Sequence, residues 1–153
     1  MVFSSTSPIS PSVDEAGAGA LFAAWEAMRR ARELPWNADD ADSWLAAFHR
    51  EVTGARALLL AHVAVAESPS SPLLDRPSEP GAVSRQLDEH EQLVASIDQI
   101  LAAASAGTGG TIDRVVDVTE RAILLEIRMA MHLNRLHGLL GPRAAVSAAG
   151  VAR

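Results

Sequence analysis

Three histidines occupy equivalent positions in three amphipathic segments of the chain. His132 lies in a segment whose apolar residues recur at alternating intervals of three and four, and His62 and His90 interrupt two further segments of this kind. Residues with this spacing share one face of an α-helix. Neutral imidazoles that face one another are natural ligands for Fe, Zn, Ni or Cu. A transition-metal site is therefore one expectation, and an acid–base site built from the same three residues is the other.

The positions of these histidines within their helices place them at one level. A single buried histidine is usually just hydrogen-bonded, because an imidazole without a partner costs on the order of 1–3 kcal/mol. In an up-down-up-down bundle, however, His62, His90, His132 and also Trp25 would all lie roughly 9–16 Å from the same end, at 1.5 Å per residue. The acceptors that would hold the other ring nitrogens cannot be identified from the sequence.

Hydrophobic periodicity predicts four helices joined by loops rich in proline, glycine and aspartate. The first three are expected over residues 14–34, 42–67 and 80–106, and the fourth runs from Thr111 until glycines and Pro142 end it. The sequence thus predicts an all-α fold, an antiparallel up-down-up-down four-helix bundle over residues 14–142. Residues 1–13 are expected to be a flexible N-terminal segment and residues 143–153 a tail. The predicted core stripes are Leu21, Trp25 and Met28; Leu45, Phe48, Val52, Ala55, Leu59, His62 and Ala66; Val83, Leu87, His90, Val94, Ile97 and Leu101; and Val115, Val118, Ala122, Leu125, Met129, His132, Leu136 and Leu139.

Composition narrows the classes of function. The 153 residues suffice for one domain, and a net charge of −6 without a basic stripe argues against nucleic-acid binding. The absence of cysteine excludes disulfides, thiolate metal sites and a cysteine nucleophile. No apolar run approaches membrane-spanning length, and the N-terminal segment lacks the features of a signal peptide. These features predict a cytoplasmic protein that does not associate with membranes.

Four segments, in the right order, resemble the hemerythrin-like (HHE cation-binding) family. Residues Met131 to Pro142 are similar to the family's last-helix motif H-L-x-x-E-E-x-x-L-F-P, and Leu87 to Leu93 to its third-helix motif L-x-E-H-x-x-L. Residues His62 to Glu67 resemble its second-helix motif H-x-x-x-E-E, and Phe22 to Arg29 fit its first-helix histidine segment. The resemblance implies a hemerythrin-like bundle with two irons between histidines and bridging carboxylates, which binds oxygen or a related molecule.

The chain departs from the family at several ligand positions. Trp25 stands where the first-helix histidine would be, and Ala66 and Leu136 stand where two of the carboxylates would be. Val94 supplies no second histidine on the third helix. Without bridging carboxylates two neighbouring cations would lose their charge compensation, so the departures favour a mononuclear site over a di-iron centre.

Three hypotheses of function follow. In the first, His62, His90 and His132 bind iron or another transition metal, with His137 and Glu67 as further candidates, and the metal takes oxygen, nitric oxide or peroxide. In the second, no metal is bound, and the three core histidines act as acid and base on a small molecule. The third hypothesis is a helical interaction module without a site. The sequence leaves open whether the protein is an enzyme.

Trp25, Met129 and Leu136 are expected to line the small-molecule pocket of the core. A buried indole N–H requires an acceptor, and the imidazoles at this level are the nearest candidates. An imidazole that accepts this bond is no longer free to bind a metal. We therefore expect Trp25 to divide the metal-binding hypothesis from the metal-free one.

The fourth helix has more apolar residues than one buried face requires. We expect a second buried face, which either mediates a homodimer or is covered by the N-terminal segment. Its members are Val116, Ile123, Leu124, Ile127 and Met131.

Overall fold

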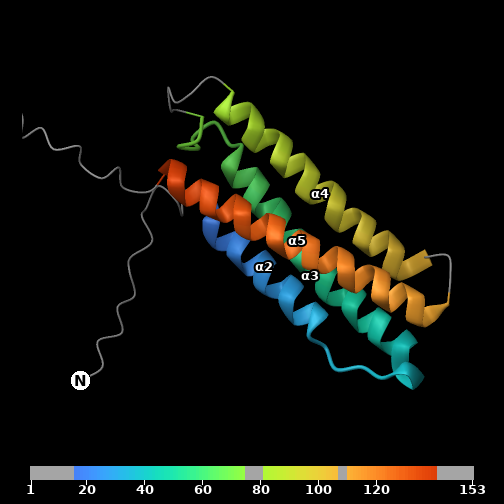
Figure 1. The fold of residues 1–153 in the computed structure, drawn as a ribbon. Coiled ribbons are helices and arrows are strands. Elements are labelled where there is room, and N and C mark those ends of the chain that lie inside the picture. The colour runs from blue at the N-terminus through green and yellow to red at the C-terminus, as the bar shows by residue number, and fades with distance from the viewer. Residues whose placement is uncertain (1–15, 75–80, 107–109, 141–153) are drawn as a thin grey trace, which may run out of the picture.

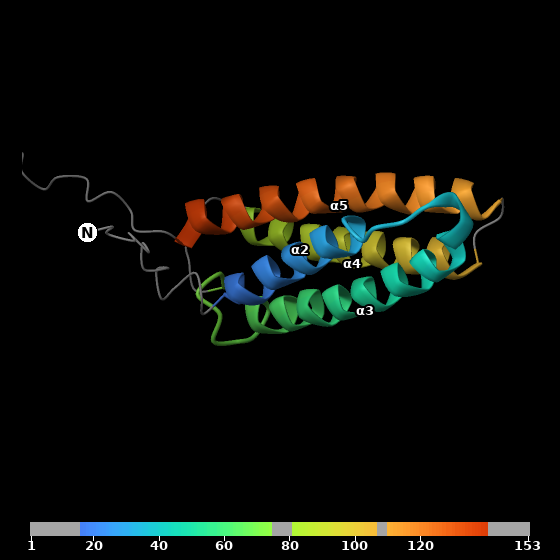
Figure 2. The same ribbon diagram turned by 90° about the horizontal axis from the view of Figure 1, so that it is seen from below.

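Four long helices make up the fold in the computed structural model, which describes residues 16–74, 81–106 and 110–140. They are α2 (Ala18–Arg32), α3 (Ala41–Ala66), α4 (Ala82–Ala106) and α5 (Thr111–Leu140), and a 3₁₀ turn, η1 (Ala38–Asp40), precedes α3. The helices lie side by side, and contacts join α2 to α3, α3 to α4, α4 to α5 and α5 to α2 (Figures 1 and 2). The predicted all-α, up-down four-helix bundle is confirmed. The predicted terminal segments 1–13 and 143–153 lie outside the described residues.

Polar groups define the turn between α2 and α3. Three arginines in the last turn of α2 complement its helix dipole, and Pro35 lies just beyond the helix end. The side chain of Asn37 accepts a hydrogen bond of 3.0 Å from the backbone N–H of Asp39 and thereby caps η1. The buried indole of Trp44 donates to the carbonyl oxygen of Leu34 at 2.8 Å, which ties the start of α3 to the end of the connection.

Two of the four predicted stripes form the core as expected. Every residue of the α3 stripe is buried, and so is every residue of the α5 stripe except Leu139, which is partly exposed. These two helices supply most of the large side chains at the centre of the bundle. The largest fully buried apolar side chains are Leu21, Met28, Phe48, Leu59, Ile97, Ile100, Leu125, Met129 and Leu136.

The predicted stripes of α2 and α4 are partly wrong. Leu87 is exposed on α4, while Gln86 beside it is buried. On α2, Trp25 is only partly buried and Phe22 is exposed, and alanines take the buried positions. In α4, apolar residues occur in adjacent pairs such as Leu93–Val94. Two neighbouring faces of the helix are therefore apolar in sequence, and helix packing decides which of them is buried. The buried residues of α2 are Ala18, Leu21, Ala24, Ala27, Met28 and Ala31, and those of α4 are Ala82, Gln86, His90, Leu93, Ile97, Ile100 and Ala104.

The apolar interior consists of two separate clusters. The larger fills the middle of the bundle and extends along α5 as far as Met129. The smaller lies beyond His132, contains Leu136, and is completed by Leu73 from the segment after α3. The layer between these clusters therefore contains the buried polar side chains described below. No helix in the described ranges has the length and apolar character that crossing a membrane requires.

A bidentate ion pair joins α2 to α5. The Nε and Nη2 atoms of Arg32 donate to the two carboxylate oxygens of Glu126 at 2.9 and 3.2 Å, and this bond raises the pKa of Arg32. The Glu126 side chain is only 10% exposed. Its carboxylate thus depends on Arg32, because a buried acceptor without a partner is costly.

Replacing Arg32 with Met should lower the free energy of unfolding by about 1–2 kcal/mol, since it leaves the Glu126 carboxylate unpaired. Arg29→Met is the matched control, because Arg29 pairs with Glu33 on the exposed surface of α2 and should change stability by less than about 0.5 kcal/mol. Urea unfolding measures both. Equal effects of the two substitutions would contradict a structural role for the Arg32–Glu126 pair.

Candidate metal centre

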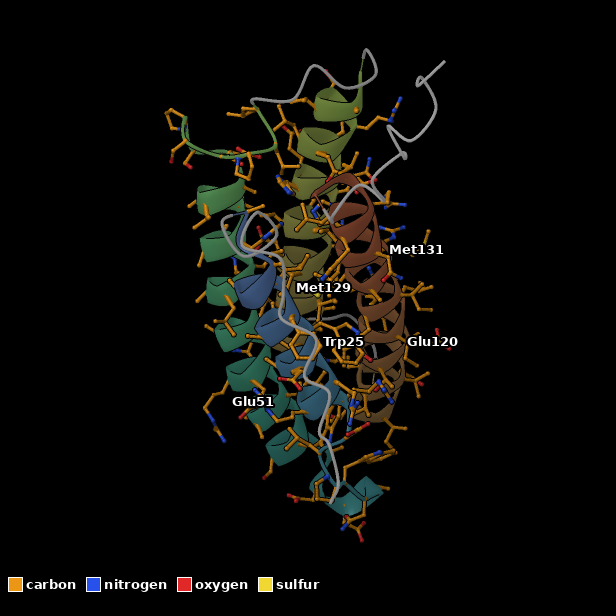
Figure 3. All side chains as sticks on the ribbon, turned by 90° about the vertical axis from the view of Figure 1, so that its left-hand side faces the viewer. Trp25, Glu51, Glu120, Met129 and Met131 are labelled. Carbon is orange, nitrogen blue, oxygen red and sulfur yellow. The ribbon has the colours of Figure 1, made fainter. Side chains whose placement is uncertain are left out.

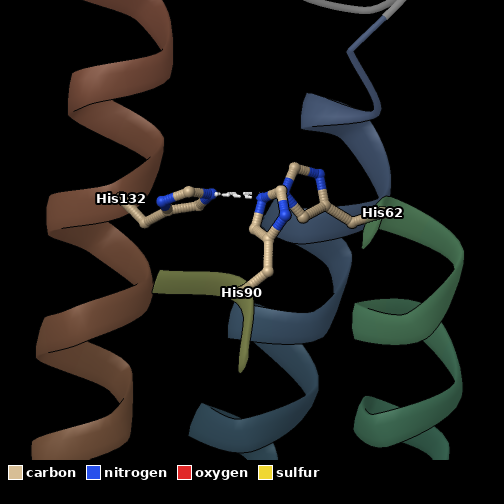
Figure 4. A group of neighbouring side chains, drawn as sticks. All are labelled: His62, His90 and His132. Carbon is tan, nitrogen blue, oxygen red and sulfur yellow. Dashed lines mark hydrogen bonds between the residues drawn. The ribbon is translucent and has the colours of Figure 1, made fainter. Parts of the chain in front are cut away.

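His62, His90 and His132 meet in the layer between the two apolar clusters. They project from α3, α4 and α5, respectively, and each is at most 1% exposed. Their ring centroids are 4.9–5.4 Å apart, and the rings stand nearly perpendicular to one another (Figure 4). The prediction that the three histidines share one core layer is confirmed.

The Nε2 atoms of the three rings point at one another. The Nε2 atom of His132 lies 3.1 Å from that of His90 and 3.3 Å from that of His62. Ligand atoms of all three residues lie within 4.8 Å of one another, so a single ion could contact all of them. Helix α2 supplies no imidazole to this group.

Each Nδ1 atom faces a different oxygen atom. His62 Nδ1 lies 3.0 Å from the carbonyl oxygen of Gly17, His90 Nδ1 lies 2.9 Å from Glu67, and His132 Nδ1 lies 2.5 Å from Glu89. A carbonyl or carboxylate oxygen only accepts hydrogen bonds, so each Nδ1 carries the proton and donates. In a neutral imidazole, Nε2 then carries a lone pair. Three lone pairs consequently converge at the centre of the cluster.

Near neutral pH, protons cannot satisfy all three Nε2 lone pairs. One proton can join His132 Nε2 to only one of its two neighbours, which leaves the third lone pair without a donor. Burial, followed by repulsion from His90, lowers the pKa of His62 from 6.5 to about 3, and burial also lowers the pKa of His132. The imidazolium form is therefore disfavoured, and the cluster presents neutral imidazoles that could hold a metal ion.

The nitrogen separations suit a transition metal. Metal–imidazole bonds are about 2.0–2.1 Å long, which sets the nitrogens about 3.3–3.4 Å apart at tetrahedral angles and about 2.8–3.0 Å apart at right angles. The observed separations of 3.1 and 3.3 Å fall within this range. The acceptors on the three Nδ1 atoms fix the tautomer and orientation of each ring, as in established metal sites.

Gly17 positions His62, and sequence reasoning missed it. Its φ of 77° lies in the left-handed region that favours glycine. Its carbonyl oxygen accepts from His62 and also from the backbone N–H of Leu21 at 3.2 Å. A Cβ atom at this position would lie 3.2 Å from three atoms of His62. The first turn of α2 and the imidazole thus depend on the same glycine.

The two carboxylates at the site differ in their surroundings. Arg135 binds Glu89 through two contacts, of 2.8 and 3.2 Å, and thereby holds the carboxylate that orients His132. Glu67, at the C-terminal end of α3, is 39% exposed and bonds to His90. Glu67 was predicted as a candidate ligand, but its oxygen lies on Nδ1 of His90, on the outer side of the ring.

Several predicted site residues lie outside the cluster. His137 is exposed, and its Nδ1 faces the carbonyl oxygen of Leu133 at 2.8 Å. Met129 and Leu136 are fully buried, one turn before and one turn after His132. Trp25 lies between α2 and α5 (Figure 3), where its ring stacks on Phe22 with centroids 5.7 Å apart.

The expected hydrogen bond from the Trp25 indole to an imidazole is absent. In the described part of the chain, each Nδ1 atom of His62, His90 and His132 faces an oxygen atom, and each Nε2 atom faces another imidazole. Trp25 also carries the guanidinium of Arg29 over its ring, at 5.7 Å from the centroid. The histidine lone pairs are therefore not occupied by the tryptophan.

A surface groove between α3 and α4 reaches the cluster at His90. Its volume is about 490 Å³. Glu67 and His90 belong to its wall, so the groove connects solvent with the outer side of one of the three rings. The remaining lining residues are Val63, Leu87, Glu91, Val94, Ala95 and Asp98.

Comparison of the chain with protein-family models, curated proteins and solved structures gave no significant match.

Replacing Gly17 with Ala should lower the free energy of unfolding by about 1–2 kcal/mol, because the left-handed conformation is costly for alanine and the methyl group would crowd His62. Gly54→Ala is the matched control: Gly54 lies within α3 with open space around it, and alanine there should stabilise the helix by about 0.5–1 kcal/mol. Urea unfolding compares the two. A Gly17→Ala variant as stable as Gly54→Ala would refute the role assigned to Gly17.

Proposed function

We propose that the protein binds one transition-metal ion through the Nε2 atoms of His62, His90 and His132. The observation that supports this most strongly is the convergence of three Nε2 lone pairs, each fixed by an acceptor on the opposite ring nitrogen. Neutral, oriented imidazoles are the form that binds a metal. A cation at their centre would satisfy all three at once.

One ion fits the donor set better than two. The carboxylates of Glu67 and Glu89 face Nδ1 atoms on the outer sides of the rings. One turn beyond His62 and His132, the buried side chains are Ala66 and Leu136, which offer no ligand atom. The bundle and the histidine layer agree with the hemerythrin-like resemblance, whereas these residues argue against a bridged di-iron centre.

The charges around the site suit a divalent ion. Glu67 and Glu89 contribute two negative charges close to the cluster, and Arg135 compensates one of them. Hydrogen bonds from Nδ1 to carboxylates also make the imidazoles more basic and hence better donors. An imidazole-only set suits Fe, Zn, Ni and Cu, and we propose iron because of the resemblance to the hemerythrin-like family.

Three protein ligands leave a bound metal with open coordination positions. Iron there would supply a site for a small ligand such as oxygen, nitric oxide or peroxide. The apolar side chains of Met129 and Leu136 flank the layer and exclude bulk water. Gln86 is buried one turn before His90, and its side-chain oxygen has no hydrogen-bond partner. We propose that this oxygen accepts a hydrogen bond from a protonated peroxide in this part of the core, since oxygen and nitric oxide have no proton to donate.

The direct test is the metal content of the intact chain. Wild-type protein reconstituted with Fe²⁺ under anaerobic conditions should bind one equivalent, measured by elemental analysis after removal of free metal. His62→Gln, His90→Gln and His132→Gln should each weaken binding at least 100-fold, because each removes one of three ligands. Glu89→Gln should weaken it 10–100-fold through His132.

His49→Gln and His137→Gln are the matched controls, because neither residue belongs to the cluster, and both variants should bind like the wild type. Absence of binding by a folded wild-type protein for Fe²⁺, Zn²⁺, Ni²⁺ and Cu²⁺ alike would reject the metal site and leave the metal-free acid–base hypothesis. Equal loss in the control variants would reject the ligand assignment.

The metal-free protein should become less stable as the pH falls. The pKa of His62 is about 3 in the folded state and about 6.5 when unfolded, so between these values the unfolded chain binds more protons. The free energy of unfolding should therefore decrease on acidification below pH 6.5, by about 1.4 kcal/mol per pH unit for each such histidine. His132 acts in the same direction.

Urea unfolding of the metal-free protein at pH 7, 6, 5 and 4 measures this slope. His62→Gln should reduce it, whereas His137→Gln, which changes an exposed histidine, should not. A stability that stays constant from pH 7 to 4 would show that the cluster takes up protons without cost and would contradict the proposed state of the imidazoles.

A further inference from the structure

The outward face of α5 is apolar over most of its length. This stripe lies opposite the buried face, and the exposed fractions of its side chains range from 41% to 59%. Met131 projects from the side of α5 that faces away from α2 (Figure 3). The members of the stripe are Ile112, Val116, Ile123, Leu124, Ile127 and Met131. At 1.5 Å per residue it is about 28 Å long, which is more than scattered surface apolar residues explain.

Two charged residues along this stripe have no partner of opposite charge among the described residues. Glu120 lies within the stripe and is exposed (Figure 3). It makes no hydrogen bond or ion pair with a described residue. Arg128 borders the stripe and donates only to the hydroxyl of Ser96, at 3.2 Å. Other charged residues of α5 are paired within the chain: Arg121 with Asp117, Glu126 with Arg32, and Arg135 with Glu89.

We propose that this stripe is the interface of a homodimer in which α5 of one copy packs antiparallel to α5 of a second copy, with the two-fold axis beside Leu124. The proposal is independent of metal binding. Glu120 and Arg128 lie equally far from Leu124, four residues before and four after it. Two-fold symmetry therefore brings Glu120 level with the partner's Arg128, and the reciprocal pair forms on the other side of the axis.

The apolar residues match in the same register. Val116 comes within one residue of the level of the partner's Met131, and the aliphatic stem of Glu120 comes within one residue of the partner's Ile127. Leu124, the most exposed apolar residue of the stripe at 59%, meets its own copy at the axis. The pairing thus buries a continuous apolar seam and gives both unpaired charges a partner, which is the self-complementarity that a two-fold interface requires.

Charge exchange tests the register. The wild type should have twice the chain mass of 16.1 kDa in sedimentation or light scattering at about 50 µM. Glu120→Arg and Arg128→Glu should each weaken dimerisation by about tenfold, because each replaces two attractions with two repulsions. The double variant, Glu120→Arg with Arg128→Glu, should restore wild-type dimerisation, since the pairs re-form with reversed sign.

Ile127→Ser should abolish the dimer, whereas Leu60→Ser, at an exposed apolar position on α3, should leave it intact. A monomeric wild type would overturn the proposal, whether the stripe is covered by residues 1–15 or left in solvent. A dimer that the double charge exchange fails to restore would overturn it too.

Cross-linking gives a second measurement that does not depend on the stability of the charge variants. The chain has no cysteine, so Leu124→Cys introduces a single thiol at the proposed axis. Oxidation should link its two copies, because a disulfide requires Cα atoms within about 7 Å. Ile112→Cys is the control: its two copies would lie about 36 Å apart in this register. Equal cross-linking of both variants, or none of Leu124→Cys, would overturn the antiparallel arrangement.

Discussion

The mutual repulsion of three imidazole lone pairs is the constraint on which the interior depends. In water each Nε2 would accept from solvent, but at this depth only the protein or a bound cation can satisfy it. The chain directs these three acceptors at one another inside an aliphatic core and binds the opposite nitrogen of each ring with an oxygen atom. Such an arrangement is unfavourable without a cation and favourable with one, which is why it indicates a site more strongly than burial alone.

The surrounding structure maintains this arrangement from several directions. The glycine that caps the start of α2 supplies an oxygen to His62, and the first residue after α3 supplies one to His90. Glu89 of α4, which an arginine of α5 binds, supplies the third. Every helix thus takes part, although only three provide an imidazole. The two apolar clusters on either side keep the layer at a fixed height, so that the rings cannot tilt away from one another without opening the core.

The sequence predicted the buried face of a helix correctly where large apolar residues recur along that face without interruption. In α3 and α5 the apolar stripe continues without a gap over the length of the helix, so the periodicity defined the buried face and the positions of His62 and His132, although α5 has further apolar residues on its outward face. In α4 the paired apolar residues allowed two registers. In α2 the buried alanines contributed less to the predicted stripe than the larger side chains of Phe22, which is exposed, and Trp25, which is partly buried. Periodicity measures which side chains avoid water, but not how closely two helices approach.

The oxygen atoms around the cluster were harder to predict for a different reason. Glu89 and Arg135 stand 46 residues apart, and their pairing depends on the rotation of two helices about their axes. The carbonyl of Gly17 depends on a backbone conformation that has no side-chain pattern. Glu67 was predicted as a candidate metal ligand, by its distance of five residues from His62, and its carboxylate contacts Nδ1 of His90 instead. Composition reveals which groups are present, whereas orientation is decided by tertiary packing.

Each of the three helices contributes one histidine to the cluster, and this has a consequence for the metal binding proposed above. His132 lies 42 residues from His90 and 70 from His62, so no two of the three histidines belong to one helix, and a pair of consecutive helices contains at most two of them. An unfolded chain would have to close two long loops to bring the three together, at a large entropic cost. Binding of the proposed ion by all three imidazoles would thus require the assembled bundle, because a pair of consecutive helices would offer it at most two of them.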